Sequence, residues 1–162
     1  MIIGLIAIII LSWFIICELM VIYHNNPEAM NKKRKEEEIE PEARLCATRA
    51  LTLAGLTFAG IIFLITNYKA HYEDALCILV YSFGLLLLSY NFEILTGDKE
   101  LFFQIQDKLL KYGFLGLILS LLLFFWNILK IISFIILIFV IAFIILHLME
   151  SKITLEGYRS MK

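Results

Sequence analysis

The sequence predicts an all-α fold class, a polytopic bundle of about five transmembrane helices with its N-terminus outside and its C-terminus in the cytoplasm. Hydrophobic residues make up 61% of the 162 positions and charged residues 18%. A soluble domain has roughly half apolar residues and about a quarter charged ones. The apolar residues also form long runs, and lysine and arginine fall almost entirely on alternate connections between these runs. The lipid bilayer is therefore the first expected partner.

Three apolar runs in the N-terminal part of the chain are long enough to cross a membrane. A spanning helix needs about 20 mostly apolar residues, because the hydrocarbon core is about 30 Å thick and each helical residue rises about 1.5 Å. The runs cover residues 2–23, 50–68 and 75–97. We predict one transmembrane helix at each of them.

The last apolar stretch, 112–149, is too long for one span. As a single helix it would reach roughly 55 Å, well beyond the thickness of a bilayer. We therefore predict two helices, 112–129 and 131–149, that turn around Asn127 and Lys130. No Gly or Pro marks this turn, so the prediction depends on length alone.

Two connections carry most of the remaining polar residues. We interpret 24–49 as a charged cytoplasmic loop, in which the block KKRK is followed by three glutamates. A polybasic block can hold anionic lipid at about 1 kcal/mol per charge, but glutamates four positions away compete as helical ion pairs. A solvated loop is the favoured interpretation, and anionic lipid at the cytoplasmic face is the alternative. In 98–111, apolar and polar residues fall on opposite sides of a helix, which predicts an interfacial amphipathic helix.

The placement of lysine and arginine sets the predicted orientation, because cytoplasmic loops retain positive charge. Of 14 such residues, twelve fall in 24–49, in 98–111 and in the C-terminal tail, and two, Lys69 and Lys130, fall on the other side. Five spans place all twelve against one leaflet, whereas a single helix in the last stretch would export the basic tail. The 162 residues are expected to form one multi-pass domain in the cell membrane.

Ionisable residues within the predicted spans are the first candidates for a functional site, because charge inside a membrane is costly. Glu18 and Glu93 are the two acids in the predicted spans, and both are expected near the cytoplasmic end. Arg44 and Arg49 are expected at a similar depth, with Asn91 beside them. Such a cluster could gate a cation, bind a lipid headgroup or relay protons. The alternative is that the acids reach the interface or form a structural ion pair.

Small residues mark the faces along which membrane helices pack, since helices in lipid associate by close contact. Two stripes of small residues recur at helical spacing in the second and fourth spans. They are Thr48, Thr52, Gly55 and Ala59, and Gly113, Gly116 and Ser120. These faces are expected to pack one subunit's bundle, with self-association or a polar path as the alternatives.

The sequence contains no motif that names a reaction. It lacks H-E-x-x-H, G-x-S-x-G and phosphate-binding glycine loops, and we expect no catalytic residue, metal or cofactor. A net charge of −1 indicates no nucleic-acid partner. The leading hypothesis is a non-enzymatic, homo-oligomeric channel- or transporter-like protein. An accessory or assembly subunit of a larger membrane complex is the alternative, and a lipid-modifying enzyme is a more distant one.

Overall fold

The described part of the computed structural model consists of five long α-helices. They are α1 (Ile2–Asn25), α3 (Glu36–Thr66), α4 (Glu73–Leu95), α5 (Glu100–Trp126) and α6 (Lys130–Ser160). The structure describes the backbone of residues 2–25, 27, 36–67, 72–95, 100–126 and 129–160, without the side chains of 36–40, 93–95 and 150–160.

Each of the five helices is long and apolar enough to cross a membrane. The predicted all-helical fold with five helices able to span a membrane is therefore confirmed, and the length and composition of these helices indicate a membrane protein. The last apolar stretch divides as its length requires, because α5 ends at Trp126 and α6 begins at Lys130.

Two helices extend into segments that the sequence assigned to connections. The structure has one continuous helix α5 where an interfacial helix over 98–111 and a separate span were predicted. Buried side chains occur on both sides of the predicted boundary, including Leu109, Tyr112 and Leu115, so the buried face continues without a break. Likewise, α3 begins at Glu36, inside the predicted loop 24–49.

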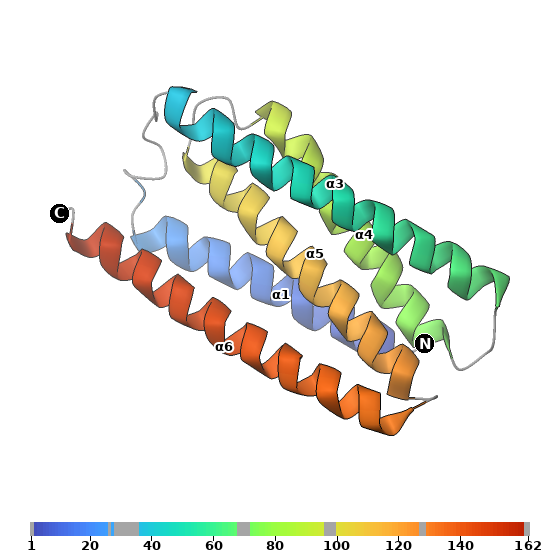
Figure 1. Ribbon diagram of the computed structural model, residues 1–162. Helices are drawn as coiled ribbons and strands as arrows, with labels where there is room; N and C mark the ends of the chain where they lie inside the picture. The colour runs from blue at the N-terminus through green and yellow to red at the C-terminus, as the bar shows by residue number, and fades with distance from the viewer. Residues whose placement is uncertain are drawn as a thin grey trace.

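Successive helices run in opposite directions, and α5 lies at the centre of the bundle (Figure 1). It packs against α1, α3, α4 and α6, while α1 also packs on α4 and α3 on α4. We call the end where α1 finishes and α3 and α5 begin the basic end. Its described basic side chains are Arg44, Arg49, Lys108 and Lys111, whereas Lys130 begins α6 at the opposite end.

Three serine hydroxyls join α4 to α5 by donating to carbonyl oxygens of the facing helix. The bonds run from Ser82 to Gly113, from Ser89 to Gln106 at 2.9 Å and from Ser120 to Ala75 at 2.8 Å. On each helix the three partners are seven residues, or two turns, apart. A seven-residue repeat is the spacing at which antiparallel helices stay in contact over a long distance, so α4 and α5 form a tightly packed pair.

Polar contacts join α1 to α4 at two levels along the helices. The carboxylate Oδ1 of Asp74 accepts a hydrogen bond from the backbone N–H of Gly4 at 2.5 Å, in the first turn of α1, where helical N–H groups have no partner within the helix. Two turns further on, the hydroxyls of Ser12 and Tyr81 lie 2.6 Å apart. The remaining surface of α1 is largely apolar and exposed, as expected for a helix that faces lipid.

A charged cluster between α1, α5 and α6 as the candidate functional site

Glu18 lies on the buried stripe of α1. The buried side chains of this helix include Leu11, Ile15 and Ile22, and Glu18 falls between them at a helical spacing of three and four residues. Its side chain is 15% exposed. The sequence therefore turns a carboxylate toward the bundle rather than toward lipid, about 10 Å from the end of a helix roughly 36 Å long.

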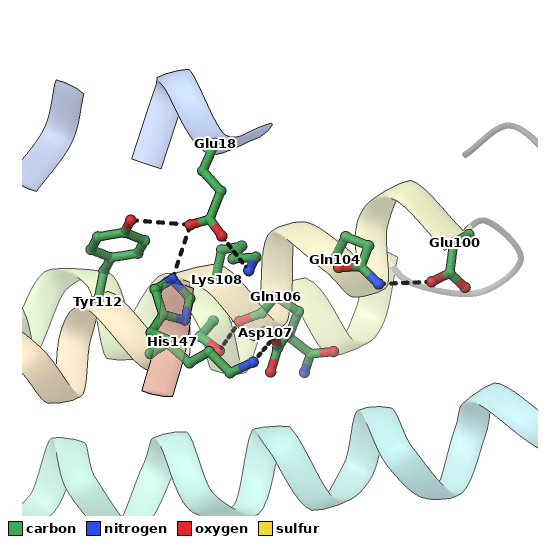
Figure 2. A network of polar contacts seen from close by, with 10 residues as sticks. Glu18, Glu100, Gln104, Gln106, Asp107, Lys108, Tyr112 and His147 are labelled. Carbon is green, nitrogen blue, oxygen red and sulfur yellow. Dashed lines mark hydrogen bonds and ion pairs between the residues drawn. The ribbon is translucent and has the colours of Figure 1, made fainter. Parts of the chain in front are cut away.

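Three side chains from two other helices converge on this carboxylate (Figure 2). Lys108 Nζ lies 2.6 Å from Glu18 Oε1, and the hydroxyl of Tyr112 donates to Oε2 at 3.0 Å. His147 Nε2 lies 3.0 Å from the same Oε2. Lys108 and Tyr112 are four residues apart and so share one face of α5, while His147 comes from α6. We call Glu18, Lys108, Tyr112 and His147 the Glu18 cluster.

The cluster is largely removed from solvent. The side chains of Lys108 and His147 are 5% and 13% exposed. Removing an ion pair from water is costly, and such a pair is stable only when its remaining hydrogen-bonding capacity is used. Here Lys108 lies on Oε1 of Glu18, and Tyr112 and His147 lie on Oε2, so both carboxylate oxygens have partners and that condition is met.

Aromatic contacts fix the imidazole of His147. Its ring meets that of Tyr112 edge to face, with centroids 5.6 Å apart and an interplanar angle of 87°. It also stacks on Phe143, with centroids 6.3 Å apart and an angle of 10°. Because Phe143 in turn packs against Phe114 of α5, the position of His147 depends on how α6 rests on α5.

Other polar groups lie around the same turns of α5. Lys111 pairs with Asp107 at 2.7 Å, and Gln104 donates to Glu100 Oε1 at 2.8 Å. The fully buried Gln106 donates from Nε2 to the carbonyl of Ala43 at 3.1 Å, and its Oε1 has no hydrogen-bond partner among the described residues. The first half of α5 is thus a polar segment inside the bundle.

The structure gives Glu18 different neighbours from those expected. Arg44 and Arg49 are exposed on α3, and Asn91 is exposed on α4. Helix α1 packs on α4 and α5, and in the described contacts Lys108 of α5 is the lysine that pairs with Glu18. The side chain of Glu93 lies outside the described residues.

Sequence reasoning missed Lys108, Tyr112 and His147 as partners of Glu18. A signal was present, because Lys108 and Tyr112 are four residues apart and fall at the same distance from the basic end as Glu18. The predicted interfacial helix over 98–111 instead places Lys108 at the membrane surface. His147 lies within the last apolar run at a similar depth, but a sequence alone does not show which helices are neighbours.

The two small-residue stripes lie on different kinds of surface. Gly113, Gly116 and Ser120 are buried against α4. Thr48, Thr52, Gly55 and Ala59 are all exposed. The buried face of α3 is instead formed by neighbouring small residues, which include Ala43, Ala47, Ala50, Ala54 and Thr57.

Among the residues that the structure describes, no group of three or more His, Cys, Asp and Glu side chains is arranged to hold a metal ion. Comparison with protein families, with curated proteins and with solved structures found no match to this chain. The proposed function therefore rests on the geometry of the Glu18 cluster.

Proposed function

We propose that this chain is a non-enzymatic, channel- or transporter-like membrane protein in which the Glu18 carboxylate binds a proton or a small monovalent cation. One observation supports this most directly: a largely buried carboxylate within a spanning helix is held by an ammonium, an imidazole and a phenol from two other helices. Ionisable groups inside a membrane are costly, and they recur in ion pathways and proton relays.

The chemistry of the cluster matches this role. The ammonium of Lys108 occupies a position on Glu18 Oε1 that an incoming monovalent cation would otherwise fill. A proton on Glu18 would likewise remove the negative charge that holds Lys108. Occupancy of the carboxylate therefore competes with contacts that link α1 to α5 and α6, which is how binding in one place can alter helix packing.

The test is ion flux into liposomes that contain the purified protein. A pH-sensitive dye inside the vesicles reports proton flux under an imposed potential, and separate vesicles report sodium and potassium flux. Wild-type protein should give flux above that of empty vesicles, and Glu18→Gln should reduce it to the background. Glu42→Gln is the matched control, since Glu42 is an exposed acid on α3 outside the Glu18 cluster, and it should retain the flux.

Two outcomes would overturn the proposal. One is wild-type protein that passes none of the three ions. The other is a Glu18→Gln variant that elutes as a folded protein in detergent and conducts like wild type. Glu18→Asp, which keeps the charge but shortens the side chain, should give intermediate flux and separates loss of the carboxylate from loss of the fold.

We further propose that the basic end faces the cytoplasm, in the cell membrane. The described side chains of Arg44, Arg49, Lys108 and Lys111 at that end support this, because cytoplasmic segments retain positive charge. In a cysteine-free background, an impermeant maleimide added to whole cells should label a cysteine at position 130 and spare one at position 159. The reverse pattern would invert the orientation.

A specific observation favours assembly as a second element of function. The stripe of Thr48, Thr52, Gly55 and Ala59 is exposed on α3, so it packs no part of the described bundle, and small residues let helices of separate chains approach closely. We propose self-association through this stripe, with docking to another membrane subunit as the alternative. The mass of the complex in mild detergent should exceed one subunit, and Gly55→Leu should lower it. A wild-type monomer would contradict self-association.

A further inference from the structure

The packing of α6 differs from that of the other helices. Only 11% of its spanning segment is buried, compared with 39% for α4 and α5. It packs on α5, whereas α1 packs on α4 and α5, and in the described part α1 and α6 are not a closely packed pair. Helix α6 is thus attached along one side, and most of its surface faces away from the bundle (Figure 1).

The two ends of α6 are held in different ways. At its start the chain is tethered covalently, because α5 ends at Trp126 and α6 begins at Lys130. The backbone N–H groups of Leu129 and Ser133 bond to the carbonyls of Phe125 and Leu129 at 2.7 and 3.2 Å, so Leu129 is bonded to both helices. Near the basic end, by contrast, α6 is joined to α1 by the contact between His147 and Glu18.

The contact between His147 and Glu18 therefore spans two helices that do not pack on each other closely. It joins side chains at 3.0 Å (Figure 2), whereas the serine contacts between α4 and α5 lie within a tightly packed interface. A polar bridge of this kind depends on the charge of the carboxylate, since an ionised acceptor makes a hydrogen bond roughly twice as strong as a neutral one.

We infer that the bridge between Glu18 and His147 acts as a latch that holds the basic end of α6 close to α1. Loss of the carboxylate charge would break the bridge and allow this end of α6 to move away from α1, while α6 stays in contact with α5. The inference goes beyond the proposed function, because it concerns the position of a helix and holds whichever ion the protein carries. It assigns the described side chains of the cluster separate roles, with Lys108 and Tyr112 orienting the carboxylate on α5 and His147 reporting its state to α6.

The latch can be tested by measuring the distance between α1 and α6 with paired spin labels. The labels are attached at Tyr23→Cys and Met149→Cys, two exposed positions near the basic end. The natural cysteines are replaced first, by Cys17→Ser, Cys46→Ala and Cys77→Ser. In this background the distance distribution should be narrow.

Variants of the latch give the decisive comparison. His147→Leu and Glu18→Gln should lengthen the mean distance by several ångströms and broaden its distribution. His147→Gln should restore the narrow distribution, because the glutamine amide offers an N–H donor at a similar reach. His24→Gln is the matched control, since His24 is an exposed histidine of α1 outside the cluster, and it should change nothing.

A second label pair separates helix movement from unfolding. Val80→Cys and Leu121→Cys place labels on exposed positions of α4 and α5, and their distance should stay constant in every variant. An unchanged distance between α1 and α6 in His147→Leu would overturn the latch. So would an equal displacement in His147→Gln and His147→Leu, because it would show that the donor is irrelevant. Ion flux is measured separately, so failure of the proposed function would leave this result standing.

Discussion

Gly113 lies against Leu86 so closely that a methyl group in place of its hydrogen would come within 2.8 Å of both Leu86 Cγ and Cδ2. Leu86 is fully buried, so its side chain has no free space into which to retreat. The same glycine accepts a hydrogen bond from Ser82 through its carbonyl oxygen. A residue without a side chain at this position is therefore what allows the backbones of α4 and α5 to approach.

Gly113→Ala should destabilise the bundle by about 1–3 kcal/mol, the usual cost of overpacking a well-filled interior. The measurement is the free energy of unfolding in detergent or bicelles. Gly84→Ala, on α4 and outside the proposed self-association stripe, is the matched control, because nothing lies within 4 Å of the Cβ that would be added there. It should be neutral or stabilise by up to about 1 kcal/mol, since alanine is the better helix former. Equal effects of the two substitutions would contradict this account of the interface.

Lys108 provides the next test, because it is the positive partner of a buried acid. Lys108→Met leaves the carboxylate of Glu18 without its ammonium and should cost about 3 kcal/mol, as expected when one member of a buried ion pair is removed. Combining Lys108→Met with Glu18→Leu should recover most of that loss. The readout is a double-mutant cycle of unfolding free energies.

The control for that cycle lies one turn away. Lys111 pairs with Asp107 four residues earlier on the same helix, and both side chains are 22% exposed. Lys111→Met should therefore cost less than about 0.5 kcal/mol. If Lys108→Met lost as little unfolding free energy as Lys111→Met, the ion pair between Lys108 and Glu18 would contribute little to stability. The burial of the Glu18 cluster would then no longer support a functional role.

The contrast between Lys108 and Lys111 also shows which features of the fold can be predicted from the sequence and which cannot. The lengths of the apolar runs predicted five spans, including a break near Lys130 that no Gly or Pro marks. The same criterion placed Lys108 and Lys111 outside the membrane, because each looks like a charge that needs water. In the structure Lys108 is paired with Glu18, 90 positions earlier in the chain, and a pairing over that distance depends on which helices are neighbours.

The packing faces show the same limit. Gly113 and Ser120 belong to a seven-residue repeat that is visible in the sequence, and it meets a matching repeat, Ser82 and Ser89, on α4. On α3, the stripe through Thr52 was as regular, but the face through Ala54 is the buried one. Both faces carry small residues, so the choice between them is made by the position of α4 and is not encoded in α3 alone.

For Gln106, in contrast to Lys108, an apolar substitution should cost little unfolding free energy. The reason is that its buried Oε1 has no hydrogen-bond partner among the described residues. Gln106→Met has a similar volume, and it removes both the unpaired acceptor and the bond that Nε2 donates to Ala43. These effects oppose each other, so the substitution should be neutral within about 1 kcal/mol. Gln106→Glu should cost about 3 kcal/mol, as a charge placed inside a membrane helix does. A large loss of unfolding free energy in Gln106→Met would contradict this balance between the unpaired Oε1 and the bond to Ala43.

Asp74 caps the start of α1 from a different helix, through the bond that its carboxylate accepts from the N–H of Gly4. Asp74→Ala removes the acceptor and should cost about 1 kcal/mol, the usual value of a helix cap. Asp74→Asn keeps an oxygen in place and should cost less, because only the attraction between the charge and the helix dipole is lost. Hydrogen exchange measures the effect locally: the amide of Gly4 should exchange faster in Asp74→Ala, while that of Ile15, deeper in α1, keeps its rate. Unchanged exchange at Gly4 would mean that the first turn of α1 is held by other contacts.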